Sequence, residues 1–111
     1  MSKRDIELFL DDIKISCEAI FDYVDGLDFE DFICDRKTYS AVIREFEIIG
    51  EAVKHLPIKI KQKYDEVGWR DIVDFRNLLI HEYFGVDFEI VWNTIKYDLP
   101  ILYKIIKDIK I

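Results

Sequence analysis

The chain has 111 residues, of which 50% are hydrophobic and 14% aromatic. This is enough material for one packed domain, and it excludes an intrinsically disordered chain. Four Gly and two Pro are too few for the many turns of a β-sandwich or a barrel. The sequence therefore predicts a single domain over residues 1–111.

The net charge of −7 comes from 16 basic and 23 acidic side chains, which are spread unevenly. Residues 1–35 carry 3 basic and 11 acidic side chains, whereas residues 36–111 carry 13 and 12. Nonspecific clamping of a nucleic-acid duplex requires many cationic contacts to phosphates, so this composition disfavours it. Any anionic ligand is expected to bind in the later two thirds of the chain.

The cysteines and histidines give no sign of a metal site. Cys17 and Cys34 form no CxxC pair, and together with His55 and His81 they lack the spacing of zinc ligands. The polar, charged start of the chain does not resemble a signal peptide, and no apolar run approaches the roughly 20 residues of a membrane span. A reduced, soluble, cytoplasmic protein is the expectation.

Apolar residues recur at helical spacing along the first half of the chain. Gly26 is placed to end a first helix, and residues 27–36 are expected to form a connection whose Phe29, Phe32 and Ile33 tuck against the core. Asp35 is expected to cap a second helix from about Arg36 to Lys54. Gly50 lies inside that helix, where glycine costs about 1 kcal/mol relative to alanine, so we expect it to permit close helix–helix contact.

The second half continues the pattern. Pro57 suits the first turn of a short helix that Gly68 stops, and a fourth helix is predicted from Trp69 to Phe84. Asp87 is expected to cap a long last helix that Pro100 kinks locally. The predicted fold class is all-α, a bundle of four main helices plus a short connecting helix.

The most unusual stretch lies late in the fourth predicted helix, where Arg76, Asn77, His81 and Tyr83 surround Leu78, Leu79 and Ile80. The three apolar residues are expected to anchor the helix in the core. Asn77 and His81 are four residues apart and share a helix face, whereas Arg76 and His81 diverge by roughly 140°. Arg76 and His81 can serve one site if Arg76 reaches along a groove, or if two subunits bring two copies together.

Structural interpretations of these residues stay open at this point. Arginine near a helix end is commonly solvated or salt-bridged, and a single histidine in a bundle is commonly structural. Glu47 and Glu51 lie one turn apart without a histidine at useful spacing, which favours a solvated or arginine-paired face over a metal site. Four basic residues precede the motif in the sequence: Lys59, Lys61, Lys63 and Arg70. They attract RNA if they lie near the cleft, and otherwise they form an ordinary solvated face.

The chain resembles the HepT-like proteins of the HEPN superfamily, the toxin half of HepT/MNT toxin–antitoxin pairs (type VII). Arg76, His81 and Tyr83 match the family signature of Arg, four residues, His, one residue, Tyr. Supporting segments occur in the expected order over nearly the whole chain: 44–52, which contains Gly-Glu-Ala, then 69–72, 75–77, 86–87 and 91–92. The chain departs from the family at Asp74 and Phe75, where many members carry small or apolar residues, and the added carboxylate is expected to weaken phosphate binding.

The resemblance implies a HEPN-like bundle that forms a symmetric homodimer and acts as a metal-independent endoribonuclease on an RNA substrate. It implies that Arg76 and His81 of both subunits line one cleft, with no metal and no cofactor for RNA cleavage. Histidine suits proton transfer near neutral pH, and arginine offers planar donors to the charged phosphate. Asn77 has a supporting role, in which it binds substrate or orients His81.

The resemblance also implies regulation through Tyr83, although a tyrosine beside a helix end commonly packs with its hydroxyl at the rim. The matching tyrosine of the family accepts AMP from ATP, transferred by a partner nucleotidyltransferase of the MNT type that uses magnesium. A bulky anionic group two residues from His81 would block the cleft and repel RNA phosphate.

Two other functions remain open on sequence grounds. In the first alternative, the chain is a catalytically silent helical module that dimerises and docks a nucleotidyltransferase or binds nucleotide. In the second, it is itself the antitoxin and folds against an enzyme partner. Both alternatives share the predicted fold with the ribonuclease hypothesis, so the fold alone does not separate them.

Overall fold

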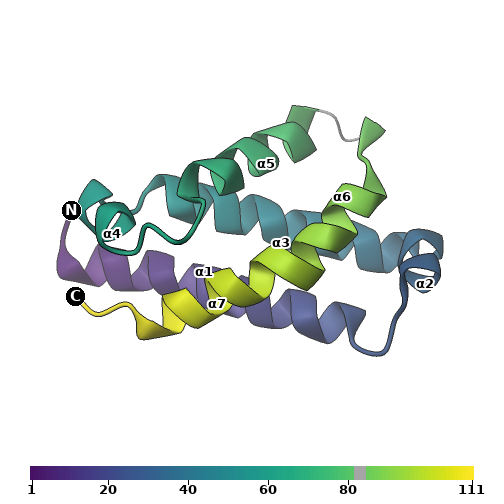
Figure 1. Ribbon diagram of the computed structural model, residues 1–111, viewed down its shortest axis with the longest axis horizontal. Helices are drawn as coiled ribbons and strands as arrows, with labels where there is room; N and C mark the ends of the chain where they lie inside the picture. The colour runs from purple at the N-terminus through teal and green to yellow at the C-terminus, as the bar shows by residue number, and fades with distance from the viewer. Residues whose placement is uncertain (82–84) are drawn as a thin grey trace.

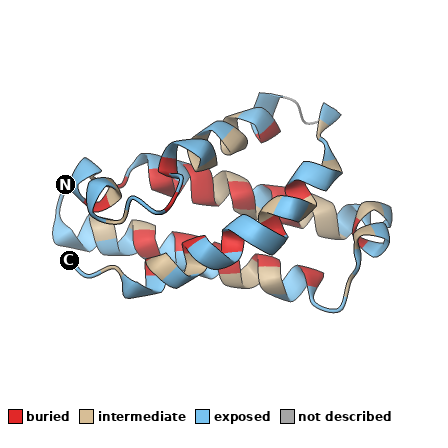
Figure 2. Cartoon of the chain, viewed as in Figure 1, coloured by how far each residue is buried: buried red, intermediate tan, exposed pale blue. Residues whose placement is uncertain are grey.

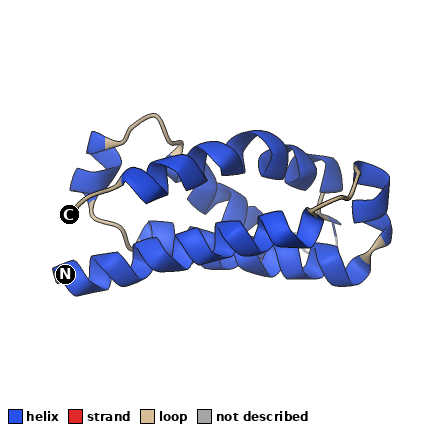
Figure 3. Ribbon diagram, turned by 90° about the horizontal axis from the view of Figure 1, so that it is seen from below, coloured by secondary structure: helices blue, strands red, loops and turns tan. Residues whose placement is uncertain are grey.

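The structure, a computed structural model, describes residues 1–81 and 85–111, so Tyr83 lies outside the described residues. Every regular element in the described part is helical (Figure 3), which confirms the predicted all-α class. The elements are α1 (Lys3–Val24), α2 (Phe29–Cys34), α3 (Arg36–Lys54), α4 (Ile58–Lys63), α5 (Trp69–His81), α6 (Phe88–Asn93), the π-helical turn η2 (Thr94–Asp98) and α7 (Leu99–Asp108).

The bundle consists mainly of α1, α3, α5 and the continuous run α6–η2–α7 (Figure 1). The long helices α1 and α3 pack against each other in antiparallel directions, α7 packs on α1, and α5 packs on α3. The buried faces of these helices turn toward one another (Figure 2), as the spacing of their apolar residues predicts. The largest fully buried side chains are Phe32, Ile13, Ile20, Ile49, Leu79, Ile95 and Leu99. None of the helices within the described ranges is both long and apolar enough to cross a membrane.

Local signals in the sequence set most helix boundaries. Gly26 adopts the left-handed φ of 77° just beyond α1, a conformation that glycine adopts without strain. The Asp35 carboxylate accepts hydrogen bonds from the backbone N–H and the hydroxyl of Thr38 at the start of α3. Asp87 accepts from the backbone N–H of Glu89 at the start of α6, 2.9 Å away. These predicted caps and the predicted bounds of α3 are confirmed.

The connection predicted over residues 27–36 contains a helix that sequence reading missed. Asp28 and Asp31 form a reciprocal capping box, in which each carboxylate accepts from the backbone N–H of the other residue. Two such bonds stabilise a helix of only six residues. Phe32, on this helix, is fully buried as expected and packs against Phe88 and Trp92.

Two predictions about proline need correction. Pro57 precedes α4 rather than lying in it, and α4 ends at Lys63, well before Gly68. The last helix does not simply kink at Pro100, because the turn before it widens into η2. Proline has no N–H for the carbonyl four residues earlier and its ring crowds that carbonyl, so a wide turn relieves the clash.

The expectation that three consecutive apolar residues anchor α5 is wrong for two of them. Leu79 is 1% exposed, but Leu78 and Ile80 are 47% and 42% exposed. Consecutive helical residues point about 100° apart, and α5 rests mainly on α3, so one of the three positions faces the core. Trp69 anchors the start of the helix, where its indole N–H donates to the Tyr64 carbonyl at 3.0 Å.

Candidate active site at the α3–α5 contact

Gly50 of α3 and Arg76 of α5 make a close contact between the two helices. A Cβ atom built on Gly50 would lie 2.5 Å from Cγ of Arg76 and closer still to its Cβ. Side-chain atoms do not tolerate such distances, so the absence of a side chain at Gly50 lets the stem of Arg76 lie against the α3 backbone. The predicted close helix–helix contact at Gly50 is confirmed, and its partner is the arginine of the motif.

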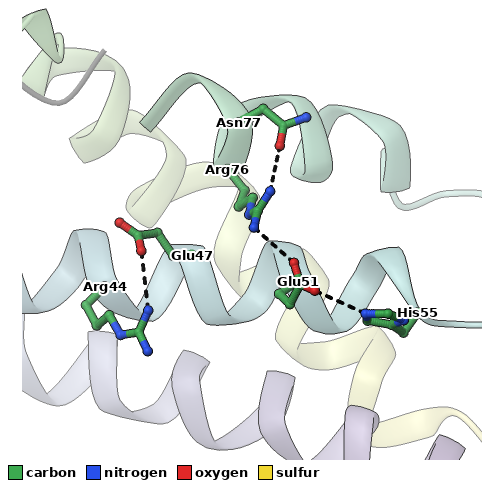
Figure 4. A network of polar contacts seen from close by, with 6 residues as sticks. All are labelled: Arg44, Glu47, Glu51, His55, Arg76 and Asn77. Carbon is green, nitrogen blue, oxygen red and sulfur yellow. Dashed lines mark hydrogen bonds and ion pairs between the residues drawn. The ribbon is translucent and has the colours of Figure 1, made fainter. Parts of the chain in front are cut away.

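The guanidinium of Arg76 is held from two sides (Figure 4). Its Nη1 donates to Oδ1 of Asn77 at 2.9 Å, and its Nη2 donates to Oε2 of Glu51 on α3 at 3.0 Å. Its Nε is buried and has no hydrogen-bond partner among the described residues. Arginine has five N–H donors, and these two bonds leave two donors on the Nη atoms for a ligand.

Glu51 links Arg76 to the end of α3. Its second oxygen, Oε1, lies 3.1 Å from Nε2 of His55, and the His55 ring stacks on Phe9 of α1 with centroids 5.1 Å apart. The pKa of Glu51 is lowered, chiefly by the hydrogen bond with His55 and then by the positive charges of Arg76 and Lys54. Glu51 is therefore ionised at neutral pH.

A groove of about 230 Å³ opens beside this network, between α1, α3 and α5. Charged side chains on its walls are Asp12 of α1, Arg44, Glu47 and Glu51 of α3, and Arg76 of α5. Arg44 and Glu47 pair one turn apart at 3.4 Å. The interpretation of Glu47 and Glu51 as an arginine-paired face is confirmed, with a different arginine for each. The expectation that no histidine lies at useful spacing is wrong, because His55, four residues after Glu51, contacts it.

His81 lies apart from the Arg76 network within one chain. It is exposed at the last described turn of α5, and no hydrogen bond joins it to another described residue. α3 and α5 run antiparallel (Figure 1). Glu51, the partner of Arg76, lies in the last turns of α3, whereas His81 is the last residue of α5. The structure thus places both side chains on one helix without bringing them together in a single chain.

The remaining candidate residues have definite places. Asn77 contacts Arg76, and no hydrogen bond joins it to His81 within the described part of the chain. Asp74 lies 3.9 Å from Nε of Arg70 on an exposed face of α5. Lys59, Lys61 and Lys63 lie on α4, which is near the start of α5 (Figure 1), whereas His81 is the last residue of α5.

Sequence reasoning did not identify Glu51 as the partner of Arg76. The signal available was Glu51 next to Gly50, because a long side chain beside a glycine at a close helix contact can reach the neighbouring helix from the edge of that contact. Across residues 1–81 and 85–111, no group of three or more His, Cys, Asp or Glu side chains is placed to hold a metal.

Comparison with known proteins defines the class to which this bundle and its motif belong. The family model described as "Ribonuclease HepT-like" matches residues 13–109. The chain therefore belongs to the HepT-like ribonuclease family, and the resemblance seen in the motif is confirmed.

Relatives with ribonuclease names are similar in sequence to this chain over nearly its full length. The "Probable ribonuclease HepT" of Thermococcus cleftensis is 46% identical, covering 90% of this chain and 91% of the relative. A Methanocaldococcus jannaschii protein named "Putative RNase" is 42% identical, covering 99% of this chain and 94% of the relative. Another protein named "Putative RNase", from Caldanaerobacter subterraneus, is 45% identical, covering 91% and 90%. No solved structure matches the chain.

Proposed function

We propose that this protein is a metal-independent endoribonuclease and the toxin of a HepT/MNT pair. The observation that carries the proposal is the arrangement of Arg76, a cation positioned in a groove by two hydrogen bonds with further donors available, on the same helix as the exposed His81. Membership of the HepT-like ribonuclease family supports RNA as the substrate class.

The reaction requires only groups that this chain can supply. The 2′-oxygen of one nucleotide forms a bond to the adjacent phosphorus, and the bond from phosphorus to the 5′-oxygen breaks. One histidine takes the proton from the 2′-hydroxyl, and another donates a proton to the leaving 5′-oxygen. Arg76 stabilises the charge that builds on the phosphoryl oxygens. The products are a 2′,3′-cyclic phosphate and a 5′-hydroxyl.

A two-fold homodimer would complete this site, because one chain holds a single His81 that lies away from its own Arg76. The exposed apolar side chains Leu78 and Ile80 on the same helix support an interface there. Leu78 also lines a cavity of about 230 Å³ with Ile90, which is 47% exposed. Light scattering at micromolar concentration should give the mass of a dimer, and a strictly monomeric chain would contradict the composite site.

Activity is tested directly with purified protein and labelled RNA in the presence of EDTA. We expect cleavage that leaves cyclic phosphate or its hydrolysis product, and a loss of about 10²-fold or more in His81→Ala. Arg44→Ala is a matched control, because Arg44 lines the same groove without lying on the motif helix. Cleavage abolished by EDTA, or unchanged in His81→Ala, would contradict the mechanism.

We further propose that a partner nucleotidyltransferase, with ATP and magnesium, transfers AMP to Tyr83 and so blocks RNA binding. Tyr83 lies outside the described residues, and the proposal rests on the motif and on the exposed position of His81 two residues earlier. Intact mass spectrometry after incubation with the partner should show added AMP on the wild type and none on Tyr83→Phe, which keeps nuclease activity. Labelling that persists in Tyr83→Phe would contradict this regulation.

The alternative of a catalytically silent docking module is favoured by one observation, the pairing of Arg76 with a carboxylate in a groove that also holds Asp12 and Glu47. In that case the same RNA assay shows no cleavage, while Arg76→Ala weakens association with the nucleotidyltransferase. Cleavage that depends on His81 excludes this alternative.

A further inference from the structure

Glu51 holds a distinctive position among the acidic side chains of the described structure, because it bridges helices to reach the motif arginine. Its Oε2 accepts from Nη2 of Arg76 at 3.0 Å, and the two residues lie on different helices. Glu47, one turn earlier on α3, pairs instead with Arg44 of its own helix. The two glutamates therefore form a natural pair of test site and control.

The contacts around Arg76 fix the guanidinium in more than one direction. Gly50 leaves room for the stem, Asn77 accepts from Nη1, and Glu51 accepts from Nη2. A planar fork held at both Nη atoms cannot rotate freely about its last bonds. Glu51 thus contributes orientation, while the free donors on the Nη atoms stay available to an anion.

Glu51 is itself held in place from its other side. His55 contacts Oε1 at 3.1 Å and stacks on Phe9 with an interplanar angle of 13°. The chain of contacts Phe9–His55–Glu51–Arg76 therefore joins α1, the end of α3 and α5. A side chain held on both oxygens has less conformational freedom to lose when it fixes its partner.

We propose that Glu51 is a positioning residue for Arg76, which holds the guanidinium in the geometry that receives the RNA phosphate. This inference rests on the proposed ribonuclease function and deepens it. A competing role predicts the opposite sign: if Glu51 only occupies the site of the phosphate, its removal frees Arg76 and improves RNA binding.

The test compares Glu51→Ala and Glu51→Gln with Glu47→Ala and Glu47→Gln in the full chain. We expect Glu51→Ala to lower kcat for RNA cleavage about 10- to 100-fold, since small misplacements of a reacting group have effects of that size. Glu51→Gln keeps an acceptor oxygen and should lose less, and both Glu47 variants should stay within about twofold of wild type. Melting temperatures measured in parallel identify any variant that fails to fold.

A second readout follows Arg76 without relying on activity. In nitrogen-15 spectra of the guanidinium groups, hindered rotation gives separate signals for the Nη protons of Arg76, assigned by their loss in Arg76→Lys. We expect these signals to merge in Glu51→Ala and to persist in Glu47→Ala. His55→Phe, which keeps a ring against Phe9 and removes the nitrogen, should broaden them partly.

The outcomes separate the inference from the proposed function. If Glu51→Ala leaves kcat unchanged or raises kcat or RNA affinity, Glu51 is not a positioning residue, even though wild type cuts RNA. If Arg76 signals are unaffected by Glu51→Ala, the inference also fails. If wild type cuts no RNA while the signals merge as expected, the ribonuclease proposal fails and the structural clamp on Arg76 stands.

Discussion

Arg44 and Arg76 line one groove and each pairs with a glutamate of α3, yet the two arginines differ in their exposure and in the contacts that hold them. The side chain of Arg44 is 70% exposed and contacts a residue of its own helix at 3.4 Å. The side chain of Arg76 is 25% exposed and reaches another helix at 3.0 Å, with Asn77 as a second partner. The glutamates are exposed in the opposite order, 26% for Glu47 and 48% for Glu51. The difference therefore lies in the arginines, because Arg44 is a solvated charge that water screens, whereas Arg76 is held in one orientation.

The largest expected difference concerns RNA cleavage. Arg76→Ala should lower activity by about 10²-fold or more, because in the proposed mechanism it removes the group that stabilises charge on the phosphoryl oxygens. Arg44→Ala should change it by about threefold or less. Arg76→Lys keeps the charge but removes the planar fork, so it should resemble Arg76→Ala more than wild type. Equal losses at the two arginines in a cleavage assay would show that the groove acts only through its net charge.

The next effect concerns the contact that admits Arg76. Gly50→Ala should lower the free energy of unfolding by about 1–3 kcal/mol, because the added methyl group overlaps the stem of Arg76. Gly68→Ala is the control, since its Cβ would meet a carboxylate oxygen of Asp71 at 2.9 Å, and that exposed side chain can move away. Urea unfolding measures both. A stabilised Gly50→Ala protein, as expected for an open helix site, would contradict the close contact.

The pH dependence of stability should report on the contacts among Glu51, His55 and Arg76. The pKa of Glu51 in the folded protein is lowered from 4.5 by His55, Arg76 and Lys54. A lowered folded pKa means that ionised Glu51 stabilises the fold above its unfolded pKa, and that this contribution is lost as pH falls through the folded pKa. The stability advantage of wild type over Glu51→Gln should therefore be present at pH 6, begin to fall as the pH approaches 4.5, and disappear only below the lowered folded pKa. An advantage that does not change with pH would mean that charge is not its source.

The smallest effect is expected at the exposed pair. Glu47→Gln should change the free energy of unfolding by about 0.5 kcal/mol or less at neutral pH, because its partner Arg44 is 70% exposed and their 3.4 Å contact lies within one helix. Thermal unfolding at low and high salt measures it. A loss comparable to that of Glu51→Gln would remove the distinction between the two pairs.

The helix boundaries show which features of the fold can be predicted from short stretches of sequence. Helical spacing and capping carboxylates such as Asp35 and Asp87 predict where α3 and α6 begin, because these signals act over three or four residues. The missed helix α2 is also local in origin, since the capping box of Asp28 and Asp31 lies within the segment read as a connection. The burial of Leu79 without Leu78 and Ile80 is different, because it depends on which side of α5 meets α3.

The sequence by itself determined the all-α class, the boundaries of most helices, the family, and the positions of Arg76 and His81 on one helix. Only the tertiary structure decided that Gly50 makes room for Arg76 and that Glu51 rather than Glu47 pairs with it. Helix periodicity reports which residues share a face of their own helix, but a contact between α3 and α5 depends on how the two helices are aligned. That alignment is set by the packing of the whole bundle.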